Sequence, residues 1–423
     1  MGLVPRPTGF RGWRAALAGM PYLSRMGRIW HGPHRSAAGR AGRGSRRLRR
    51  GGLLCLAAAA ACAVPACSSG GSPLPGLASP ESHGHQRHNT APRLHVAGNR
   101  LVSARGRPVV LHGVNRSGTE FLCVQDHGIF DGPTDQPSIS AMKTWGINAV
   151  RIPLNEGCWN GESYVNPAYA GTNYQDAIKA YVRLLNANGM VAILDLHWSD
   201  GRYPVHCRSA EARCLKPMPD QAQAIPFWTS VASTFKGNGA VIFDLFNELF
   251  PERASHSEAA GWQCWLNGGT CPGISYQVAG MQTLVNTVRA TGARNVILAG
   301  GLAYANDLTG WLANEPADPA HNLAASWHSY NFNACSDITC WTSEVAPVMA
   351  QVPVVAGEIG ENTCASGYIT ALMNWLDSQS SGYLAWAWNA DFPCASGPSL
   401  ITSYAGTPTP YGAGYQAHLR SLR

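Results

Sequence analysis

Two glutamates stand out because each follows a short apolar run that is typical of a buried strand. Glu248 comes after Val241–Phe246 and Asn247, and Glu358 comes directly after Pro353–Gly357. Runs rich in Val, Ile, Leu and Phe predict strands of a parallel sheet that is covered on both faces. Barrel enzymes hold their reacting groups at the C-terminal ends of such strands. Two carboxyl groups that the fold brings together predict acid-base and nucleophilic chemistry of the kind that cleaves glycosidic bonds.

Eight apolar segments alternate with helical segments after residue 93. The predicted strands are Val109–Asn115, Ala149–Pro153, Met190–Leu196, Val241–Phe246, Val296–Ala299, Ala324–Trp327, Val354–Gly357 and Leu384–Trp388. The predicted helices include Ser138–Trp145, Tyr174–Asn188, Ala224–Phe235, Tyr276–Ala290 and Ala365–Ser378. This alternation predicts an α/β fold, a single (β/α)8 TIM barrel over residues 93–423. A doubly wound open sheet is the alternative, but no glycine-rich phosphate loop follows the first strand.

Polar or aromatic side chains stand at the ends of seven of the eight predicted strands. They are Asn115, Arg151, His197 with Trp198, Asn247 with Glu248, His328 with Tyr330, Glu358, and Trp388. Any one of these residues has a plausible structural explanation, such as a core histidine or a neutralising arginine. Because the C-terminal ends of barrel strands meet at one face, the whole set predicts an active site there.

The segments that carry these residues resemble glycoside hydrolase family 5, the cellulase-type retaining endoglucanases. They follow the family's order and are Leu111–Cys123, Trp145–Trp159, Val191–Trp198, Val241–Glu248, Ser326–Asn331, Val354–Asn362 and Ala385–Asn389. The resemblance implies that Glu248 is the acid/base and Glu358 the nucleophile. Leu249 departs from the family, which usually has proline after this acid/base glutamate, so an altered loop is expected there.

The resemblance also assigns the surrounding side chains. It implies that Asn247 binds the sugar 2-hydroxyl, and that a tryptophan of the eighth strand stacks on the sugar. The implied supporting residues are Arg151, His197, His328 and Tyr330. Trp386 and Trp388 share strand parity, and Trp388 is preferred because it is nearer the strand's C-terminal end. Trp198 is a further stacking candidate, since sugar rings present apolar C–H faces to indoles.

Two other glutamates near strand ends compete for these roles. Glu361 follows Glu358 by three residues, and Glu156 follows the second predicted strand. We expect Glu361 to point away or to cap the next helix, and Glu156 and Asp195 to orient neighbours through hydrogen bonds.

The N-terminal 67 residues carry twelve arginines, the last at position 50, and no acidic residue, and the apolar stretch Gly51–Ala66 follows these arginines. A basic region before a short apolar stretch predicts an export signal at residues 1–67 and a secreted protein. Without these arginines, 20 of the 32 basic residues remain against 25 acidic ones. The mature chain is therefore acidic, and nucleic acid is not an expected partner.

The end of this leader has two interpretations. Val64–Cys67 resembles a bacterial lipobox, which would place a lipid anchor on Cys67 at the cell surface, whereas simple cleavage after Ala63 or Ala66 would release the protein. Residues 68–92 are rich in Ser, Gly, Pro and His and predict a disordered linker.

Ten cysteines follow the leader, an even number that predicts disulfides in an exported chain. The predicted pairs are Cys123–Cys158, Cys207–Cys214, Cys264–Cys271, Cys335–Cys340 and Cys364–Cys394.

The leading hypothesis is a secreted endo-β-1,4-glucanase that hydrolyses internal bonds with retention. The alternatives are a retaining hydrolase of mannan, xyloglucan or mixed-linkage glucan, an exo-β-glucosidase, and a non-catalytic glycan-binding surface lipoprotein. We expect a β-glucan polysaccharide as substrate, no cofactor, no metal and no obligate protein partner, in a monomer.

Overall fold

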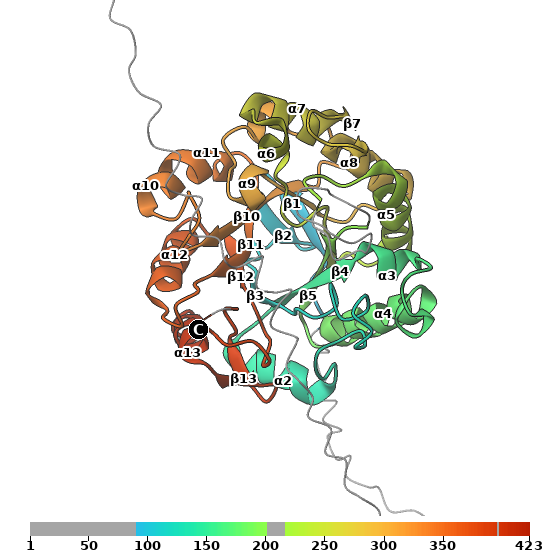
Figure 1. Cartoon of the computed structure of the whole chain (residues 1–423). Helices are drawn as coiled ribbons and strands as arrows, with labels where there is room; N and C mark the ends of the chain where they lie inside the picture. The colour runs from blue at the N-terminus through green and yellow to red at the C-terminus, as the bar shows by residue number, and fades with distance from the viewer. Residues whose placement is uncertain (1–89, 201–215, 396) are drawn as a thin grey trace, which may run out of the picture. The chain divides into compact units, whose positions relative to one another are not determined.

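Eight parallel strands close into a barrel, which Figure 1 shows nearly end-on. The computed structural model describes residues 90–200, 216–395 and 397–423. The strands are β3 (His112–Asn115), β4 (Ala149–Asn155), β5 (Val191–Trp198), β6 (Val241–Asp244), β9 (Ile297–Gly300), β10 (Leu323–Tyr330), β11 (Val354–Gly360) and β12 (Gly382–Ala385). Each pairs with the next along the chain, and β12 pairs with β3. The prediction of a (β/α)8 barrel is confirmed.

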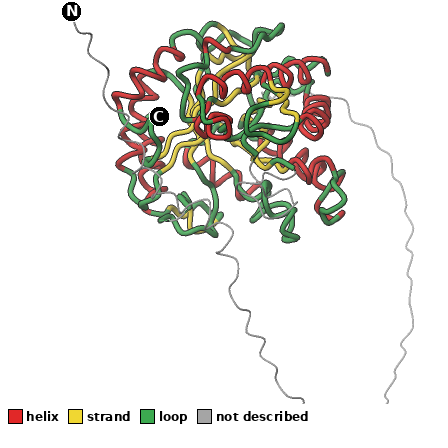
Figure 2. Tube along the Cα trace, turned by 45° about the horizontal axis from the view of Figure 1, so that its top comes forward, coloured by secondary structure: helices red, strands yellow, loops and turns green. Residues whose placement is uncertain are grey.

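Helices surround the strands, as the tilted view in Figure 2 shows. Those of eight or more residues are α2 (Gln136–Trp145), α4 (Thr172–Ala187), α5 (Gln221–Phe235), α7 (Glu258–Asn267), α8 (Met281–Ala290), α12 (Gly367–Ser378) and α13 (Pro410–Ser421). Shorter ones are α3 (Glu156–Asn160), α6 (Pro251–Ser255), α9 (Leu302–Ala305), α10 (Ile338–Cys340) and α11 (Ala346–Met349). Within the described residues, none of the helices has the length and apolar character to cross a membrane.

The strands bury both faces because alternate residues belong to different apolar layers. On β5, Val191 and Ile193 join the cluster inside the barrel, whereas Ala192 and Leu194 join the larger cluster that packs against the helices. Every residue of β4 is buried, and so is every residue of β11. The unbroken apolar runs in the sequence follow from this double burial.

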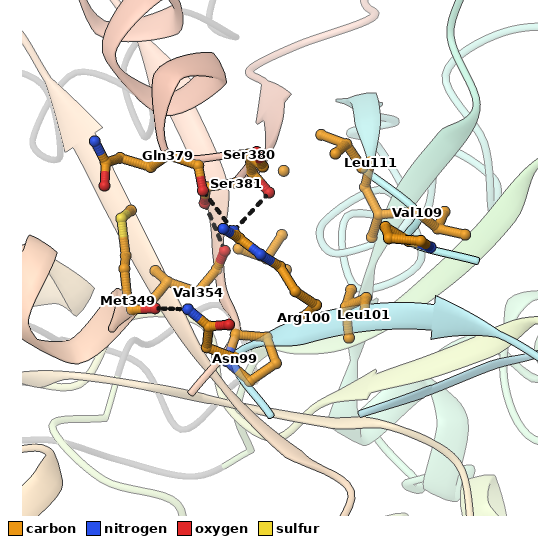
Figure 3. A pocket seen from close by; sticks show the side chains of 15 residues that line it. Asn99, Arg100, Leu101, Val109, Leu111, Met349, Val354, Gln379, Ser380 and Ser381 are labelled. Carbon is orange, nitrogen blue, oxygen red and sulfur yellow. Dashed lines mark hydrogen bonds between the residues drawn. The ribbon is translucent and has the colours of Figure 1, made fainter. Parts of the chain in front are cut away.

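A hairpin of β1 (Leu94–Ala97) and β2 (Arg100–Ser103) closes the N-terminal end of the barrel, where it appears in the centre of Figure 1. Leu94 and Leu101 pack against the apolar residues inside the barrel. Arg100 Nη1 donates to the carbonyl of Gln379 at 2.5 Å, and Asn99 Nδ2 donates to the carbonyl of Met349 at 2.8 Å, beside a small cavity (Figure 3). The C-terminal ends of the strands, at the other end of the barrel, therefore stay available for an active site.

Two predicted elements differ from the structure. Strand β12 ends at Ala385, so Trp386 and Trp388 lie beyond the strand that was predicted to extend to Trp388. The predicted helix 276–290 begins only at Met281, because Gln277–Ala279 forms β8 and pairs with β7 (Gly268–Thr270). Gly280 connects β8 to α8. A Cβ atom at this position would lie 2.4 Å from the carbonyl oxygen of Leu266, so only glycine fits there.

Four predicted disulfides are present: Cys123–Cys158, Cys264–Cys271, Cys335–Cys340 and Cys364–Cys394. The fifth, Cys207–Cys214, lies outside the described residues, as do the export signal, Cys67 and residues 68–89 of the predicted linker.

Candidate active site

Arg151 on β4 is the central group of the site. Its side chain is fully buried, and Nη1 donates to Glu358 Oε1 at 2.8 Å and to Asn115 Oδ1 at 3.0 Å. Nη2 donates to Asn247 Oδ1 at 2.8 Å and lies 2.9 Å from Asp195 Oδ2, while Nε donates to Asp244 Oδ2 at 2.9 Å. Five partner groups, from four strands or their ends, thus engage the three nitrogens of this guanidinium group.

Three carboxylates surround this single cation. Burial lowers the pKa of Arg151, but Asp195, Asp244 and Glu358 outweigh it and raise that pKa above its usual range. Burial raises the pKa of Asp195 to about 8 and that of Asp244 to about 7, although Arg151 opposes both shifts. Arg151 therefore stays charged, and its positive charge stabilises the carboxylates that it contacts, Glu358 among them.

Glu358 stands on β11 with both carboxylate oxygens held. Arg151 binds Oε1, and the hydroxyl of Tyr330 donates to Oε2 at 2.6 Å. The side chain is 5% exposed. A charge-assisted hydrogen bond and an ion pair favour the ionised form that a nucleophile requires.

A register shift between β10 and β11 determines which residues of the two strands lie side by side at the site. The pairing of β10 with β11 is regular up to Trp327 and Ala356 and then shifts, so that His328 pairs with Glu358. Gly357, the residue passed over by the shift, has no room for a side chain, since a Cβ atom would lie 2.8 Å from Ser326 Oγ and 3.1 Å from His328 Nε2. An irregularity of this kind redirects side chains next to active sites.

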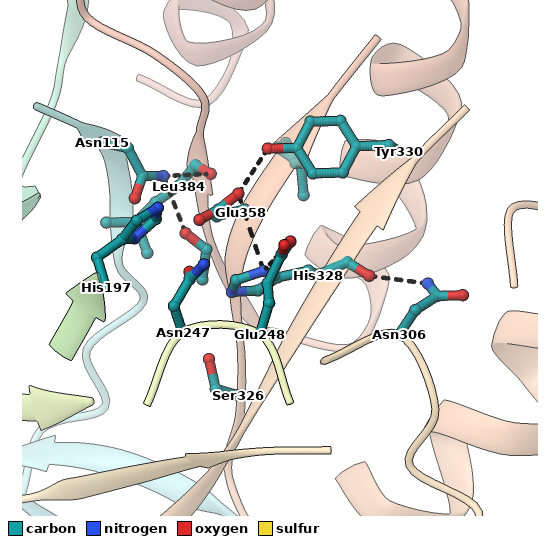
Figure 4. A network of polar contacts seen from close by, with 12 residues as sticks. Asn115, His197, Asn247, Glu248, Asn306, Ser326, His328, Tyr330, Glu358 and Leu384 are labelled. Carbon is teal, nitrogen blue, oxygen red and sulfur yellow. Dashed lines mark hydrogen bonds and ion pairs between the residues drawn. The ribbon is translucent and has the colours of Figure 1, made fainter. Parts of the chain in front are cut away.

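Glu248 faces Glu358 across His328, as Figure 4 shows. His328 Nδ1 lies 3.2 Å from Glu248 Oε1 and 3.8 Å from Glu358 Oε2. Burial raises the pKa of Glu248 well above its usual range, and the negative charge of Glu358 raises it further. Burial also lowers the pKa of His328 well below its usual range, so the imidazole is neutral. Glu248 therefore keeps its proton near neutral pH and is suited to be an acid.

The separation of the two carboxyl groups defines the stereochemistry. One oxygen of each carboxyl group and one ring nitrogen of His328 all lie within 4.8 Å of one another. Retaining enzymes hold the two groups about 5–5.5 Å apart, whereas inverting enzymes need about 6.5–9.5 Å to admit a water molecule. The same three side chains have the donor types of a divalent metal site.

His197 and Trp386 form the neighbouring wall. His197 Nδ1 lies 2.7 Å from Asp195 Oδ2, and burial lowers the pKa of His197 to about 3. The imidazole stacks on Trp386 with ring centroids 5.4 Å apart and an interplanar angle of 19°. Trp386 also packs against Tyr330. Trp198 is half-buried at the end of β5, with its ring 6.2 Å from that of Phe121.

The preference for Trp388 is wrong. Trp388 is fully buried and packs edge-on against Trp145 with ring centroids 4.9 Å apart, so a sugar ring cannot reach it. Because β12 ends at Ala385, the strand parity used for the prediction does not extend to Trp388. Trp386, at 6% exposed and stacked on His197, takes the position beside the catalytic pair.

The competing glutamates have other partners. Glu361 Oε2 accepts hydrogen bonds from the backbone N–H groups of Tyr368 and Ile369 in the first turn of α12, as a helix cap does. Glu156 Oε2 accepts from the backbone N–H of Asp200 at 2.6 Å. Sequence reasoning missed Asp244, whose signal was a charged residue inside the apolar run VIFDLF.

The barrel and this pair of carboxyl groups define a retaining β-glycan hydrolase. The family model for Cellulase (glycosyl hydrolase family 5) matches residues 102–392, and the chain belongs to that family.

The chain is also similar to individual proteins in sequence and to solved structures in fold. A mannan endo-1,4-beta-mannosidase of Salipaludibacillus agaradhaerens is 23% identical over 307 residues, covering 70% of this chain and 82% of that protein. Endoglucanase B of Clostridium cellulovorans is 28% identical over 172 residues, and the match covers 39% of this chain and only 34% of that protein. A beta-glucanase structure from Saccharophagus degradans has a TM-score of 0.59 at 18% identity, covering 79% of this chain and 94% of that one.

Proposed function

We propose that the protein is an endo-β-1,4-glucanase that cleaves internal bonds of a β-glucan with retention of anomeric configuration. The observation that carries this proposal is the close approach of Glu248 and Glu358, where burial and the charge of Glu358 raise the pKa of Glu248 and where Arg151 and Tyr330 bind Glu358. The family name and the endoglucanases among the relatives support a glucan substrate.

In the first half-reaction, a Glu358 carboxylate oxygen attacks the anomeric carbon while Glu248 gives its proton to the departing glycosidic oxygen. The C–O bond to the leaving sugar breaks as the bond to Glu358 forms, and the product is a glycosyl ester on Glu358. Asn247, held through Oδ1 by Arg151, keeps its side-chain NH2 group for the sugar 2-hydroxyl.

In the second half-reaction, water replaces the departed sugar. The ester on Glu358 is uncharged, so the repulsion that raised the pKa of Glu248 is relieved and the pKa falls. Glu248, now ionised, takes a proton from the water as the water oxygen attacks the anomeric carbon, which frees Glu358 and returns the proton to Glu248. Two inversions give net retention.

The aromatic wall suits a sugar substrate. Trp386 is held by His197 on one side and packs against Tyr330, so its orientation is fixed before a substrate arrives. An indole in a fixed orientation binds the apolar C–H face of a pyranose ring at little conformational cost. Trp198 is a second candidate for such a contact.

A mannan is the second candidate substrate, because the mannosidase relative aligns over 82% of its own length. Export by the leader, with release or a lipid anchor at Cys67, and a monomeric state complete the proposal. Export and the choice between release and an anchor rest on the sequence alone, through the basic leader and the residues around Cys67, and the monomer is the default expectation.

The test is release of reducing sugar and loss of viscosity with carboxymethylcellulose, glucomannan and xyloglucan. Wild type is compared with Glu248→Gln, Glu358→Gln and the control Glu361→Gln. The proposal expects a rapid fall in viscosity with carboxymethylcellulose that both catalytic variants abolish and the control retains. Activity on glucomannan alone would favour the mannanase, and full activity of either catalytic variant would contradict the mechanism.

A further inference from the structure

Three consecutive residues after β9 have a left-handed backbone: Ala303, Tyr304 and Ala305, with φ of 51°, 62° and 59°. None of them is glycine, and other L-residues adopt this conformation singly rather than in runs. The backbones of Leu302 and Asp307 exchange hydrogen bonds of 3.0 and 3.1 Å, which close the turn. Strain of this kind persists only where the surroundings hold it, and it is concentrated at functional sites. The mechanism above does not use this left-handed turn.

The left-handed turn is bonded to the loop that follows the acid/base. The backbone N–H of Tyr304 donates to the carbonyl of Leu249 at 2.8 Å, and its ring packs against that of Phe250 with centroids 4.8 Å apart. Leu249 directly follows Glu248 and stands where the family usually has proline. Because a proline restricts the backbone of the residue before it, leucine leaves the backbone of Glu248 freer. The bond from the turn supplies a restraint at this point.

Asn306, the residue after the turn, is bonded to the strand that carries His328 (Figure 4). Asn306 is 3% exposed, and its Nδ2 donates to the carbonyl of His328 at 2.8 Å and to that of Cys335 at 3.3 Å. Its Oδ1 accepts from the backbone N–H of Cys335 at 2.8 Å, and its carbonyl accepts from Trp327 Nε1 at 3.0 Å. The end of β10 is therefore held by this one side chain on two sides.

These bonds connect the two groups that must stay together for acid catalysis. His328 Nδ1 lies 3.2 Å from Glu248 Oε1, so the imidazole keeps the carboxyl group in place only while β10 and the loop after Glu248 keep their separation. Tyr304 holds that loop and Asn306 holds β10, with a single residue between them in the chain. Glu358 has a separate support in Arg151 on β4.

We propose that Asn306 and the left-handed turn before it position the acid/base glutamate by fixing the separation between Leu249 and His328. Asn306 is a positioning residue, because its side chain bonds to backbone groups and acts on Glu248 through His328. This role rests on the proposed hydrolysis with Glu248 as the acid. Loss of Asn306 should therefore impair proton donation to the leaving group and spare nucleophilic attack.

The test compares Asn306→Ala with Asn295→Ala at the other end of β9. Asn295 is also 3% exposed, and its Nδ2 donates to the carbonyls of Asn238 and Val241 at 2.8 Å each, so its loss removes the same kind of buried bonds away from the site. The substrates are cellopentaose, whose leaving sugar needs a proton, and dinitrophenyl β-cellobioside, whose phenolate leaves without one. The value of kcat/KM reports the first half-reaction, in which the acid gives up its proton.

We expect Asn306→Ala to lower kcat/KM for cellopentaose about ten- to hundredfold, the cost of a misplaced general acid, and to leave the aryl glycoside nearly unchanged. Retained aryl glycoside hydrolysis also shows that the variant folds. Asn295→Ala should change the two substrates by the same factor. An equal loss on both substrates in Asn306→Ala, or wild-type kinetics on both, would overturn the positioning role.

The turn itself is tested by two substitutions of the half-buried Ala303. Valine, branched at Cβ, is strongly disfavoured at a φ of 51°, whereas glycine adopts this angle freely. Ala303→Val should therefore show the same dependence on the leaving group as Asn306→Ala, and Ala303→Gly should match wild type. Wild-type kinetics for Ala303→Val would overturn the role of the turn, and this pair decides the proposal if Asn306→Ala does not fold.

The same comparison is made with mannopentaose and an aryl mannobioside if wild type prefers them. A wild-type protein that cleaves none of these substrates would overturn the proposed function instead. Carbon-13 NMR of the labelled Glu248 carboxyl group then decides the positioning separately. The pKa of Glu248 should fall in Asn306→Ala, because the carboxyl group loses its buried place beside Glu358, and an unchanged pKa would count against the proposal.

Discussion

Neutralising Glu358 is expected to lower the pKa of Glu248, because the two carboxyl groups repel each other when both are ionised. Oxygens of the two groups lie within 4.8 Å of each other. At an effective dielectric constant of about 20, unit charges at that separation repel by at least about 3 kcal/mol. The substitution Glu358→Gln removes this repulsion with little change of shape, as formation of the glycosyl ester does.

The sign of the effect is fixed by the charge of the partner. Burial and the Glu358 charge both disfavour ionised Glu248 and raise its pKa, and Glu358→Gln removes the second cause only. The pKa of Glu248 should therefore fall in the variant yet stay above that of an exposed glutamate. In wild type, the alkaline limb of the pH profile of kcat/KM should follow Glu248, since activity is lost as the acid gives up its proton.

Carbon-13 NMR of glutamate labelled at the side-chain carboxyl group measures this directly, with the resonance of Glu248 assigned from the spectrum of Glu248→Gln. The matched control is Glu361→Gln, which removes a glutamate three residues further on that caps α12. We expect the control to leave the pKa of Glu248 where it is in wild type. A pKa that stays the same or rises in Glu358→Gln would refute the electrostatic coupling and the switch from acid to base built on it.

Further predictions concern the residues around the catalytic pair. Trp388→Ala should lower the free energy of unfolding by about 3–5 kcal/mol in denaturant titration, because it empties a core position. Trp386→Ala should instead raise KM or lower kcat. A loss of activity without a loss of stability in Trp388→Ala, and the reverse in Trp386→Ala, would restore Trp388 to the site. Gly357→Ala should abolish turnover while circular dichroism stays native, since the added methyl group displaces His328, and normal turnover would contradict that contact. Cu²⁺ or Zn²⁺ should inhibit competitively by binding Glu248, His328 and Glu358, and a chelator should restore activity; inhibition that a chelator does not reverse would argue against this site.

The barrel could be predicted because its strands are buried on both faces and so leave continuous apolar runs in the sequence. All eight predicted strands overlap a strand of the barrel. The N-terminal hairpin was missed, although Gly98-Asn99 between its strands is a two-residue turn signal and Gly98 has a φ of 58°. Its strands have only four residues each, too few for a periodic pattern to appear.

The sequence predicted those site residues whose positions follow from the ends of the strands. It did not predict those whose positions depend on side-chain packing. Arg151, Glu248, His328, Tyr330 and Glu358 meet because parallel strands end at one face. The choice between Trp386 and Trp388 depended on where β12 ends and on which of the two indoles packs in the core. No local pattern in the sequence contains that information.

The register shift beside Gly357 is a second feature that only the folded chain reveals. It brings His328 level with Glu358, and it lies where a Cβ atom on Gly357 would be 2.8 Å from Ser326 Oγ on the neighbouring strand. The two buried aspartates behind Arg151 were visible as charges in apolar runs, but their shared cation is 44 to 93 residues away in the chain. Their pairing is a property of the closed barrel.

The most direct test of the account is the anomeric configuration of the first product. Proton NMR during hydrolysis of cellopentaose resolves the α- and β-anomers of the newly formed reducing end before they equilibrate. Carboxyl groups this close leave no room for a water molecule between Glu358 and the anomeric carbon, so the β-anomer should appear first and the α-anomer only later, by mutarotation. Appearance of the α-anomer first would contradict the covalent intermediate on Glu358.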